Sequence, residues 1–224
     1  MVYKRLLYSL VSVFLLCSCS KADFPNADYA QGTPPDVADF AEYSAIVTVK
    51  QNSAGSVFFQ LDDDTRLFPT NYSQPYNGMQ RIMCGLREYR QNRCDILWMD
   101  FLEKGELVEA ADWNGESDGA DILSDWMTSV EDGFLTVHYS AWWGEGDVEH
   151  TLRLVSGKNP DNPYELWFCH DSNGDTSSGK GDALVYFDID SLPSTGGDYV
   201  ILTLKWQNCA GELATKNFRF RSRQ

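Results

Sequence analysis

The stretch that decides the fold is "GFLTVHYSAWWGEGDVEHTLRLV", residues 133–155. In its first half, every second side chain is apolar, and the residues between them are more polar. Successive side chains of a strand point to opposite faces of a sheet, so this alternation predicts a half-buried strand. The side chains expected to face the core are Leu135, Val137, Tyr139, Ala141 and Trp143.

The second half of the stretch alternates in the same way. We expect it to return as the partner strand of a hairpin, through a two-residue turn at Glu145–Gly146. In this register His150 points inward as a hydrogen-bonded core residue, and His138 faces outward opposite Arg153. The inward pairs would be Trp143 with Val148, Tyr139 with Leu152, and Val137 with Leu154.

Trp142 is the candidate binding residue of this strand. As the neighbour of the core anchor Trp143, it must point to the opposite face of the sheet. There it is covered by the other domain or a loop, contacts a ligand or partner, or is simply exposed.

Similar short strands continue on both sides, so the chain is predicted to be all-β. Residues 119–224 hold six or seven strands and predict an antiparallel immunoglobulin-like β-sandwich. Residues 41–114 hold about five, with a hairpin turn at 52–55, and predict a small OB-like barrel. The polar segment 112–121 separates the two, and 122–130 is either a short helix or an irregular strand. Residues 115–119 match the pattern G-x-S-x-G, but no strand–turn–helix context supports a nucleophile there.

The N-terminal residues have the order of a lipoprotein signal. Lys4 and Arg5 precede an apolar run of eleven residues, 6–16, and a spanning helix needs about 20. Ser18 before Cys19 predicts a signal peptide over 1–18, a lipid on Cys19 and a tether over 19–40. The chain is then expected to be an outer-membrane lipoprotein of the cell envelope, facing the periplasm or the exterior and held by its lipid anchor. The alternative is a soluble secreted protein.

Charge and cysteines narrow the function further. The net charge of −15 repels nucleic acid, which we exclude as a partner. Four cysteines remain after the signal, with three pairings, and free buried thiols are an equal alternative. They are Cys84, Cys94, Cys169 and Cys209. No pair has the C-x-x-C spacing of zinc or thioredoxin-like sites.

The loop "DSNGDTSSGKGD", residues 171–182, resembles a calcium loop. Asp171, Asn173, Asp175 and Asp182 occupy positions 1, 3, 5 and 12 of an EF-hand window. However, the loop joins strands rather than helices, and Thr176 replaces the central glycine. These departures favour a hydrogen-bonded hairpin loop, with calcium as the alternative and no other cofactor expected.

Several segments together resemble the NigD-like lipoproteins of Gram-negative anaerobes. They are "SDWMTSVEDGFLTVHYSAWWG", "HTLRLVSGKNPDNPYELWFCHDSNGDT", "DALVYFDIDSLP" and "LTLKW", with "IVTVK" and "FFQLDDDT" earlier in the chain. The resemblance implies an OB-like barrel followed by a β-sandwich, and an immunity role beside a bacteriocin. It supplies no catalytic residues, and no nucleophile–base set is visible. We therefore expect a non-enzymatic protein that binds a protein or glycan partner. The alternative is a carbohydrate- or peptide-binding module for uptake or adhesion at the cell surface.

Overall fold

The computed structural model describes residues 40–144, 147–176 and 178–223. The all-β prediction is confirmed: the one helical element in those ranges is a single turn, η1 (Arg90–Asn92). Among these residues no helix is long and apolar enough to cross a membrane. The predicted signal peptide, the lipidated Cys19, the tether and the turn at 145–146 lie outside the described residues.

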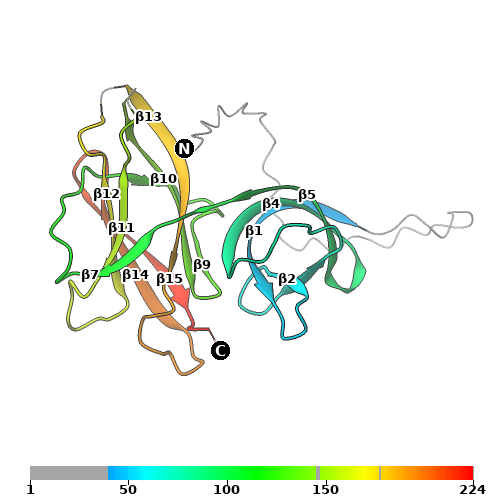
Figure 1. Cartoon of the computed structure of the whole chain (residues 1–224). Helices are drawn as coiled ribbons and strands as arrows, with labels where there is room; N and C mark the ends of the chain where they lie inside the picture. Colours follow the sequence, from blue (N-terminus) through cyan, green and yellow to red (C-terminus); the bar gives the residue numbers. More distant parts are fainter. Residues whose placement is uncertain (1–39, 145–146, 177, 224) are drawn as a thin grey trace, which may run out of the picture. The chain divides into compact units, whose positions relative to one another are not determined.

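The N-terminal strands close into a small barrel (Figure 1). They follow one another around it in the order β1-β2-β3-β5-β4, and β3 and β5 run parallel. This is the strand order of an OB-fold. The predicted hairpin at 52–55 is confirmed, because β1 pairs with β2 and Gly55 has φ 85°. The strands are β1 (Ala41–Gln51), β2 (Val57–Gln60), β3 (Arg66–Pro69), β4 (Gln80–Glu88) and β5 (Arg93–Phe101).

The barrel interior follows the period of two in its strands. Alternate residues of β1 point inward and meet alternate residues of β4 and β2. The buried set is Ala45, Val47, Val49, Phe59, Leu67, Ile82, Cys84, Leu86 and Cys94.

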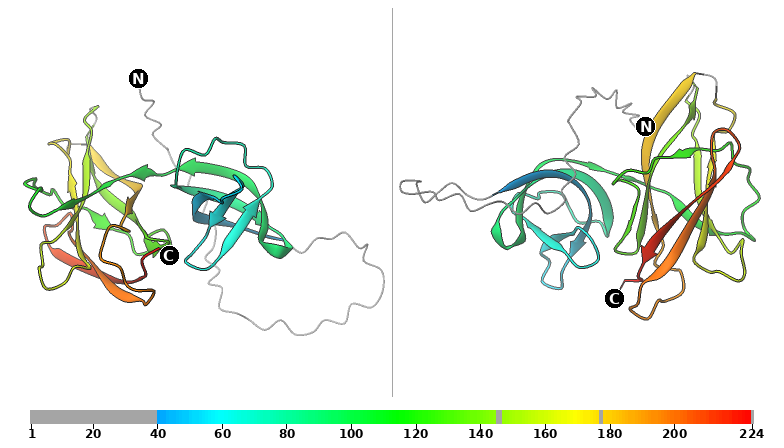
Figure 2. Two further views of the ribbon diagram at one scale, coloured as in Figure 1. Left: turned by 60° about the horizontal axis from the view of Figure 1, so that its bottom comes forward. Right: turned by 180° about the vertical axis from the view of Figure 1, so that it is seen from behind.

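The C-terminal strands form two sheets that share one core (Figure 2). The first sheet has the order β6 (Glu103–Lys104), β13 (Gly179–Asp188), β10 (Phe134–Trp143), β8 (Asp121–Ile122), with β9 (Ser129–Glu131) also on β10. The second has the order β15 (Leu213–Phe220), β14 (Val200–Gln207), β12 (Glu165–Asp171), β11 (Thr151–Ser156), β7 (Glu106–Glu109). Three pairs are parallel, β6–β13, β7–β11 and β12–β14, whereas the sequence predicts only antiparallel ones.

The predicted pairing of β10 with β11 is wrong. Trp143 lies opposite Gly179 and Tyr139 opposite Ala183 on β13, whereas Leu152 lies opposite His170 on β12. The two strands therefore belong to different sheets. Their inward faces were predicted correctly, because both contribute buried side chains to the same core. Alternation determines which face is buried, but a hairpin and a crossover between sheets give the same pattern.

The change from barrel to sandwich comes earlier in the chain than the sequence predicts. β6 and β7 pair with sandwich strands β13 and β11, so the barrel ends with β5 and the chain crosses at Leu102. Segment 122–130 contains no helix; β8 and β9 lie at its ends, with a turn between them.

Buried charge joins barrel and sandwich. Arg81 of β4 is fully buried. It donates to Thr48 Oγ1 at 3.2 Å and to Glu131 Oε2 of β9 at 3.1 Å. Its guanidinium and that of Arg223 lie 5.8 and 4.3 Å from the ring centroid of Phe134. Burial lowers the pKa of Arg81, and Glu131 opposes that shift by favouring the charged form.

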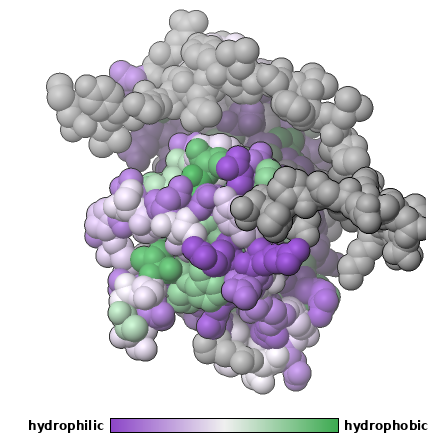
Figure 3. Space-filling model, turned by 90° about the vertical axis from the view of Figure 1, so that its right-hand side faces the viewer, coloured by the Kyte–Doolittle hydropathy of each residue, from purple (hydrophilic) through white to green (hydrophobic). Residues whose placement is uncertain are grey.

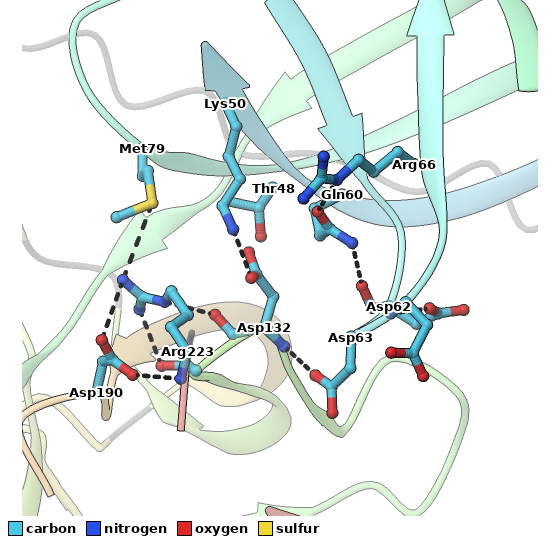
Figure 4. A network of polar contacts seen from close by, with 12 residues as sticks. Thr48, Lys50, Gln60, Asp62, Asp63, Arg66, Met79, Asp132, Asp190 and Arg223 are labelled. Carbon is cyan, nitrogen blue, oxygen red and sulfur yellow. Dashed lines mark hydrogen bonds and ion pairs between the residues drawn. The ribbon is translucent and has the colours of Figure 1, made fainter. Parts of the chain in front are cut away.

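A second part of this junction involves the acidic run 62–64 of the barrel (Figure 4). Asp63 accepts the backbone N–H of Asp132 at 2.8 Å and the hydroxyl of Tyr199 at 2.9 Å. The ammonium of Lys50 lies 2.6 Å from Asp132 Oδ1. The carboxylates of Asp63 and Asp132 therefore hold the two domains together rather than forming an open acidic surface.

Candidate functional site

Trp142 lies on the outer face of the first sandwich sheet. Its side chain is 42% exposed, so among the predicted alternatives the cover by a domain or loop is incomplete. Lys180 stands opposite it on β13, and the ammonium lies 5.3 Å from the ring centroid. The same ammonium is 2.6 Å from Asp121 Oδ2 of β8. Trp142 thus carries a fixed cation on its ring, a contact of cation–π type.

The loop between β8 and β9 brings a second tryptophan to this side. Trp126 is 54% exposed, and its neighbour Asp125 lies 2.6 Å from Nδ1 of His138. Asp182 lies 3.0 Å from Nε2 of the same ring. His138 does face outward, as predicted, but it is covered and stands opposite Leu184 rather than Arg153. Both ring nitrogens of His138 already have hydrogen-bond partners, so the imidazole is not available as a general base.

The four candidate calcium ligands do not converge. Asp171 accepts the backbone N–H of Asn173 at 2.8 Å, and the Asn173 amide donates 2.6 Å to a backbone carbonyl before β11. Asp175 lies beside the buried His150, whereas Asp182 is bonded to His138 on the outer face. In the described part of the chain, no three His, Cys, Asp or Glu residues form a group that could hold a metal ion. Each of the four side chains is therefore already paired with another group of the chain.

Two buried histidines meet at the end of the sandwich. His150 points inward, as predicted, and stacks on Trp143 with 4.0 Å between ring centroids. Its Nδ1 lies 2.9 Å from Nε2 of His170, whose Nδ1 is 3.2 Å from the carbonyl oxygen of Gly119. A carbonyl can only accept, so His170 carries a proton on Nδ1 and its Nε2 accepts from His150. Burial, followed by the neighbouring His150, lowers the pKa of His170.

The G-x-S-x-G match has a structural role. Ser117 Oγ bonds the backbone N–H and carbonyl of His170, each at 3.3 Å. The imidazole of His170 is bonded to Gly119 instead of the hydroxyl. Hydroxyl and imidazole therefore do not form the nucleophile–base pair that acyl transfer needs.

The four cysteines of the described residues, Cys84, Cys94, Cys169 and Cys209, are free thiols in this structure. Burial raises the pKa of Cys84 to about 12 and that of Cys94 to about 11. Burial also raises the pKa values of Cys169 and Cys209. All four are therefore protonated near neutral pH and are poor nucleophiles.

A cavity of about 470 Å³ lies at the mouth of the barrel. The β1–β2 hairpin forms one wall, and the loop from Thr70 to Met79 forms the other. Two tyrosines of that loop, Tyr72 and Tyr76, pack on the barrel core. The sequence did not point to them, because this ten-residue loop has no hydrophobic period.

A family model matches the sandwich. Residues 106–220 match the NigD-like C-terminal β-sandwich domain, which is just over half of the 224-residue chain. A comparison with functionally curated proteins found no match.

Solved structures of similar fold come from species of Parabacteroides and Bacteroides, and the similarity covers most of both chains. A protein described as toxin-related from Parabacteroides distasonis is 23% identical, with a TM-score of 0.66 over 81% of this chain and 94% of its own. A NigD-like immunity protein from Bacteroides caccae is 17% identical, with a TM-score of 0.56 over 80% of this chain and 96% of its own. A lipoprotein from Bacteroides fragilis is 12% identical, with a TM-score of 0.55 over 82% of this chain and all of its own. At these identities the likeness concerns the fold.

Proposed function

This chain belongs to the NigD-like family, and from that premise we propose that it protects its cell by binding a protein toxin, without catalysis, at the cell envelope. The observation that carries the proposal is the family match over the sandwich, together with a similar structure that is named an immunity protein. The structural similarity to that protein extends over both domains, because it covers 80% of this chain.

The polar groups of the described residues support binding rather than chemistry. Both nitrogens of His138 are held by carboxylates, and His170 is held by Gly119 and His150. The thiols are protonated and mostly buried. A protein that acts by occupying a partner's surface needs a rigid frame, and the junction of barrel and sandwich provides one through buried ion pairs.

Location at the envelope is part of the same proposal. It rests on the order of charge, apolar run, Ser18 and Cys19 in the sequence, and a similar structure is described as a lipoprotein. Labelling of cells with a fatty acid analogue tests the anchor. Cys19→Ala should abolish the label, whereas Cys17→Ala should keep it. Label on the Cys19→Ala protein would show that the anchor is elsewhere.

The immunity role can be tested in the native bacterium. Supernatant of the parent strain is first shown to kill a related strain and is then applied to a strain that lacks this gene. We expect the deletion strain to be killed and the intact gene to restore survival. Equal survival of the parent and the deletion strain would contradict the proposal.

Carbohydrate or peptide binding is the second candidate function. The observation in its favour is the exposed Trp142, since an exposed aromatic ring can pack against a sugar or a peptide side chain. Trp142→Ala would then weaken binding of cells or protein to that ligand while leaving protection from the toxin unchanged.

A further inference from the structure

The cavity at the barrel mouth differs in its chemistry from a second pocket among the described residues. The second hollow, about 760 Å³, is lined by charged side chains that include Asp188 and Arg223. Those two are already paired, with Arg223 Nη2 2.5 Å from Asp188 Oδ1. A ligand there would compete with this ion pair for both charges.

The barrel mouth is uncharged. The residues that line it are amides, hydroxyls, tyrosines and small apolar groups, and none of the described lining residues is Asp, Glu, Lys, Arg or His. In a chain with a net charge of −15, an uncharged hollow of this size favours a neutral ligand over an ionic one. A volume of about 470 Å³ is within the range of small-molecule sites.

The polar groups of the mouth are available. Within the described residues, the side chains of Ser56, Ser73, Gln74 and Tyr76 have no hydrogen bond to the rest of the chain. The hydroxyl of Tyr72 is buried and also has no partner. A buried polar group without a partner costs about 1–3 kcal/mol, and a bound polar ligand or water at the mouth would remove that cost.

The loop that carries the tyrosines is held at its root. The Asn71 amide donates to the carbonyl of Ile96 at 3.0 Å and accepts the N–H of the same residue at 2.8 Å. Thr70 is bonded to the barrel through the backbone of Cys94 at 2.9 Å. The tyrosine ring of Tyr72 packs edge-on against Phe59, with 5.7 Å between centroids. The wall of the mouth is thus preorganised, which lowers the entropic cost of binding.

We propose that the barrel mouth, defined as Gln51, Ser56, Tyr72, Ser73, Gln74 and Tyr76, is a binding site for a neutral saccharide. The tyrosine rings would pack on the C–H faces of a sugar, and the amides and hydroxyls would bond its hydroxyl groups. On the face drawn in Figure 3, apolar residues lie in small patches among hydrophilic ones.

Trp142 is a weaker position for the same ligand. One side of its ring is near the ammonium of Lys180, which Asp121 holds at 2.6 Å. A sugar that stacked there would have to share or displace that cation. The inference about the mouth does not depend on the immunity role, since toxin protection and saccharide binding are measured separately.

Affinity electrophoresis of the mature chain from Ser20, made without its lipid, tests the site. The gels contain α-mannan, β-glucan, arabinogalactan or, as a charged polymer, polygalacturonate. We expect retardation by at least one of the three neutral polysaccharides. Tyr76→Ala and Gln74→Ala should weaken it about tenfold or more, as loss of a central contact does.

A matched variant separates the mouth from other aromatic positions of the barrel. Phe68→Ala changes an exposed aromatic residue that does not line the mouth, and it should keep the retardation. Gln74 is exposed, so its substitution tests the site without risk to folding. The proposal is overturned if no neutral polysaccharide retards the protein, if Gln74→Ala and Tyr76→Ala bind like the parent, or if Phe68→Ala abolishes binding.

Discussion

Glu131→Gln should destabilise the protein far more than a surface substitution of the same kind. It leaves the guanidinium of Arg81, which is 0% exposed, without its counter-charge. Arg81 would keep only the bond to Thr48, because its Nε has no partner among the described residues. Breaking a fully buried ion pair costs about 3–5 kcal/mol. Glu131 is 31% exposed, so water softens the loss, and we expect about 2–3 kcal/mol.

The matched control is Glu42→Gln. Glu42 and Arg87 form a pair of similar length, 2.6 Å, but their side chains are 45% and 39% exposed. Loss of an exposed pair costs about 1 kcal/mol or less. For a chain of this size, the Glu131 variant should unfold about 5–10 °C below the parent, and the control within a few degrees of it.

A double variant tests whether the cost arises from the unpaired charge. In Arg81→Met, Glu131→Met both partners become apolar, and replacing a buried pair by hydrophobic residues is often neutral or stabilising. Urea unfolding should therefore place the double variant above Glu131→Gln. The reasoning fails if Glu131→Gln costs no more than Glu42→Gln, or if the double variant is the least stable of the three.

Three further predictions follow from single contacts. Burial lowers the pKa of His170, so the unfolded chain takes up a proton at this residue before the folded chain does. The free energy of unfolding should therefore fall as pH drops below about 6.5. In urea unfolding, the difference in that free energy between pH 8 and pH 5 should be smaller for His170→Gln than for the parent. Gly105→Ala would place a Cβ 2.2 Å from Cε1 of the fully buried Phe187. Overpacking should lower the free energy of unfolding by about 1–3 kcal/mol. The control Gly179→Ala, at a position with open space around it, should lower it by less in the same unfolding experiment. Calcium chloride should give no binding heat in calorimetry and no rise in melting temperature, because the four candidate ligands Asp171, Asn173, Asp175 and Asp182 have other partners; a rise that Asp171→Asn removes would contradict this.

The sequence predicts the faces of strands well and their partners poorly. The alternation from Leu135 to Trp143 correctly indicates which side chains reach the core, because the penalty for exposing apolar area acts on each residue separately. Pairing depends on which strands the connections bring together. Strands β10 and β11 belong to different sheets although they follow one another in the chain, and short strands such as β6 and β7 are too brief to show a period. For this reason the hairpin was wrong and the change of domain was placed too late.

For the candidate site, too, the sequence predicts which face a residue lies on but not which residues it contacts. Trp142 was expected on the outer face because neighbouring residues alternate, and it is there. The contacts that define its surroundings, Lys180 and Asp121, come from strands 38 and 21 residues away in the chain. Tyr72 and Tyr76 belong to a loop without periodicity, so no pattern marks them. Their position at the barrel mouth follows from the closure of the barrel and from the fixed root of the loop at Asn71.

Two segments, β1 and the loop that ends at Met79, contribute both to the barrel mouth and to the junction of barrel and sandwich. β1 carries Lys50, which bonds Asp132 of the sandwich, directly before Gln51 of the mouth. The loop that holds the tyrosines ends at Met79, whose sulfur lies 3.9 Å from Arg223 Nη1. A ligand that shifts either wall of the mouth is therefore expected to displace one of these two contacts at the junction. Binding at the mouth and the stability of the junction are therefore expected to be coupled, and a saccharide that stabilises the fold would do so through β1 and this loop.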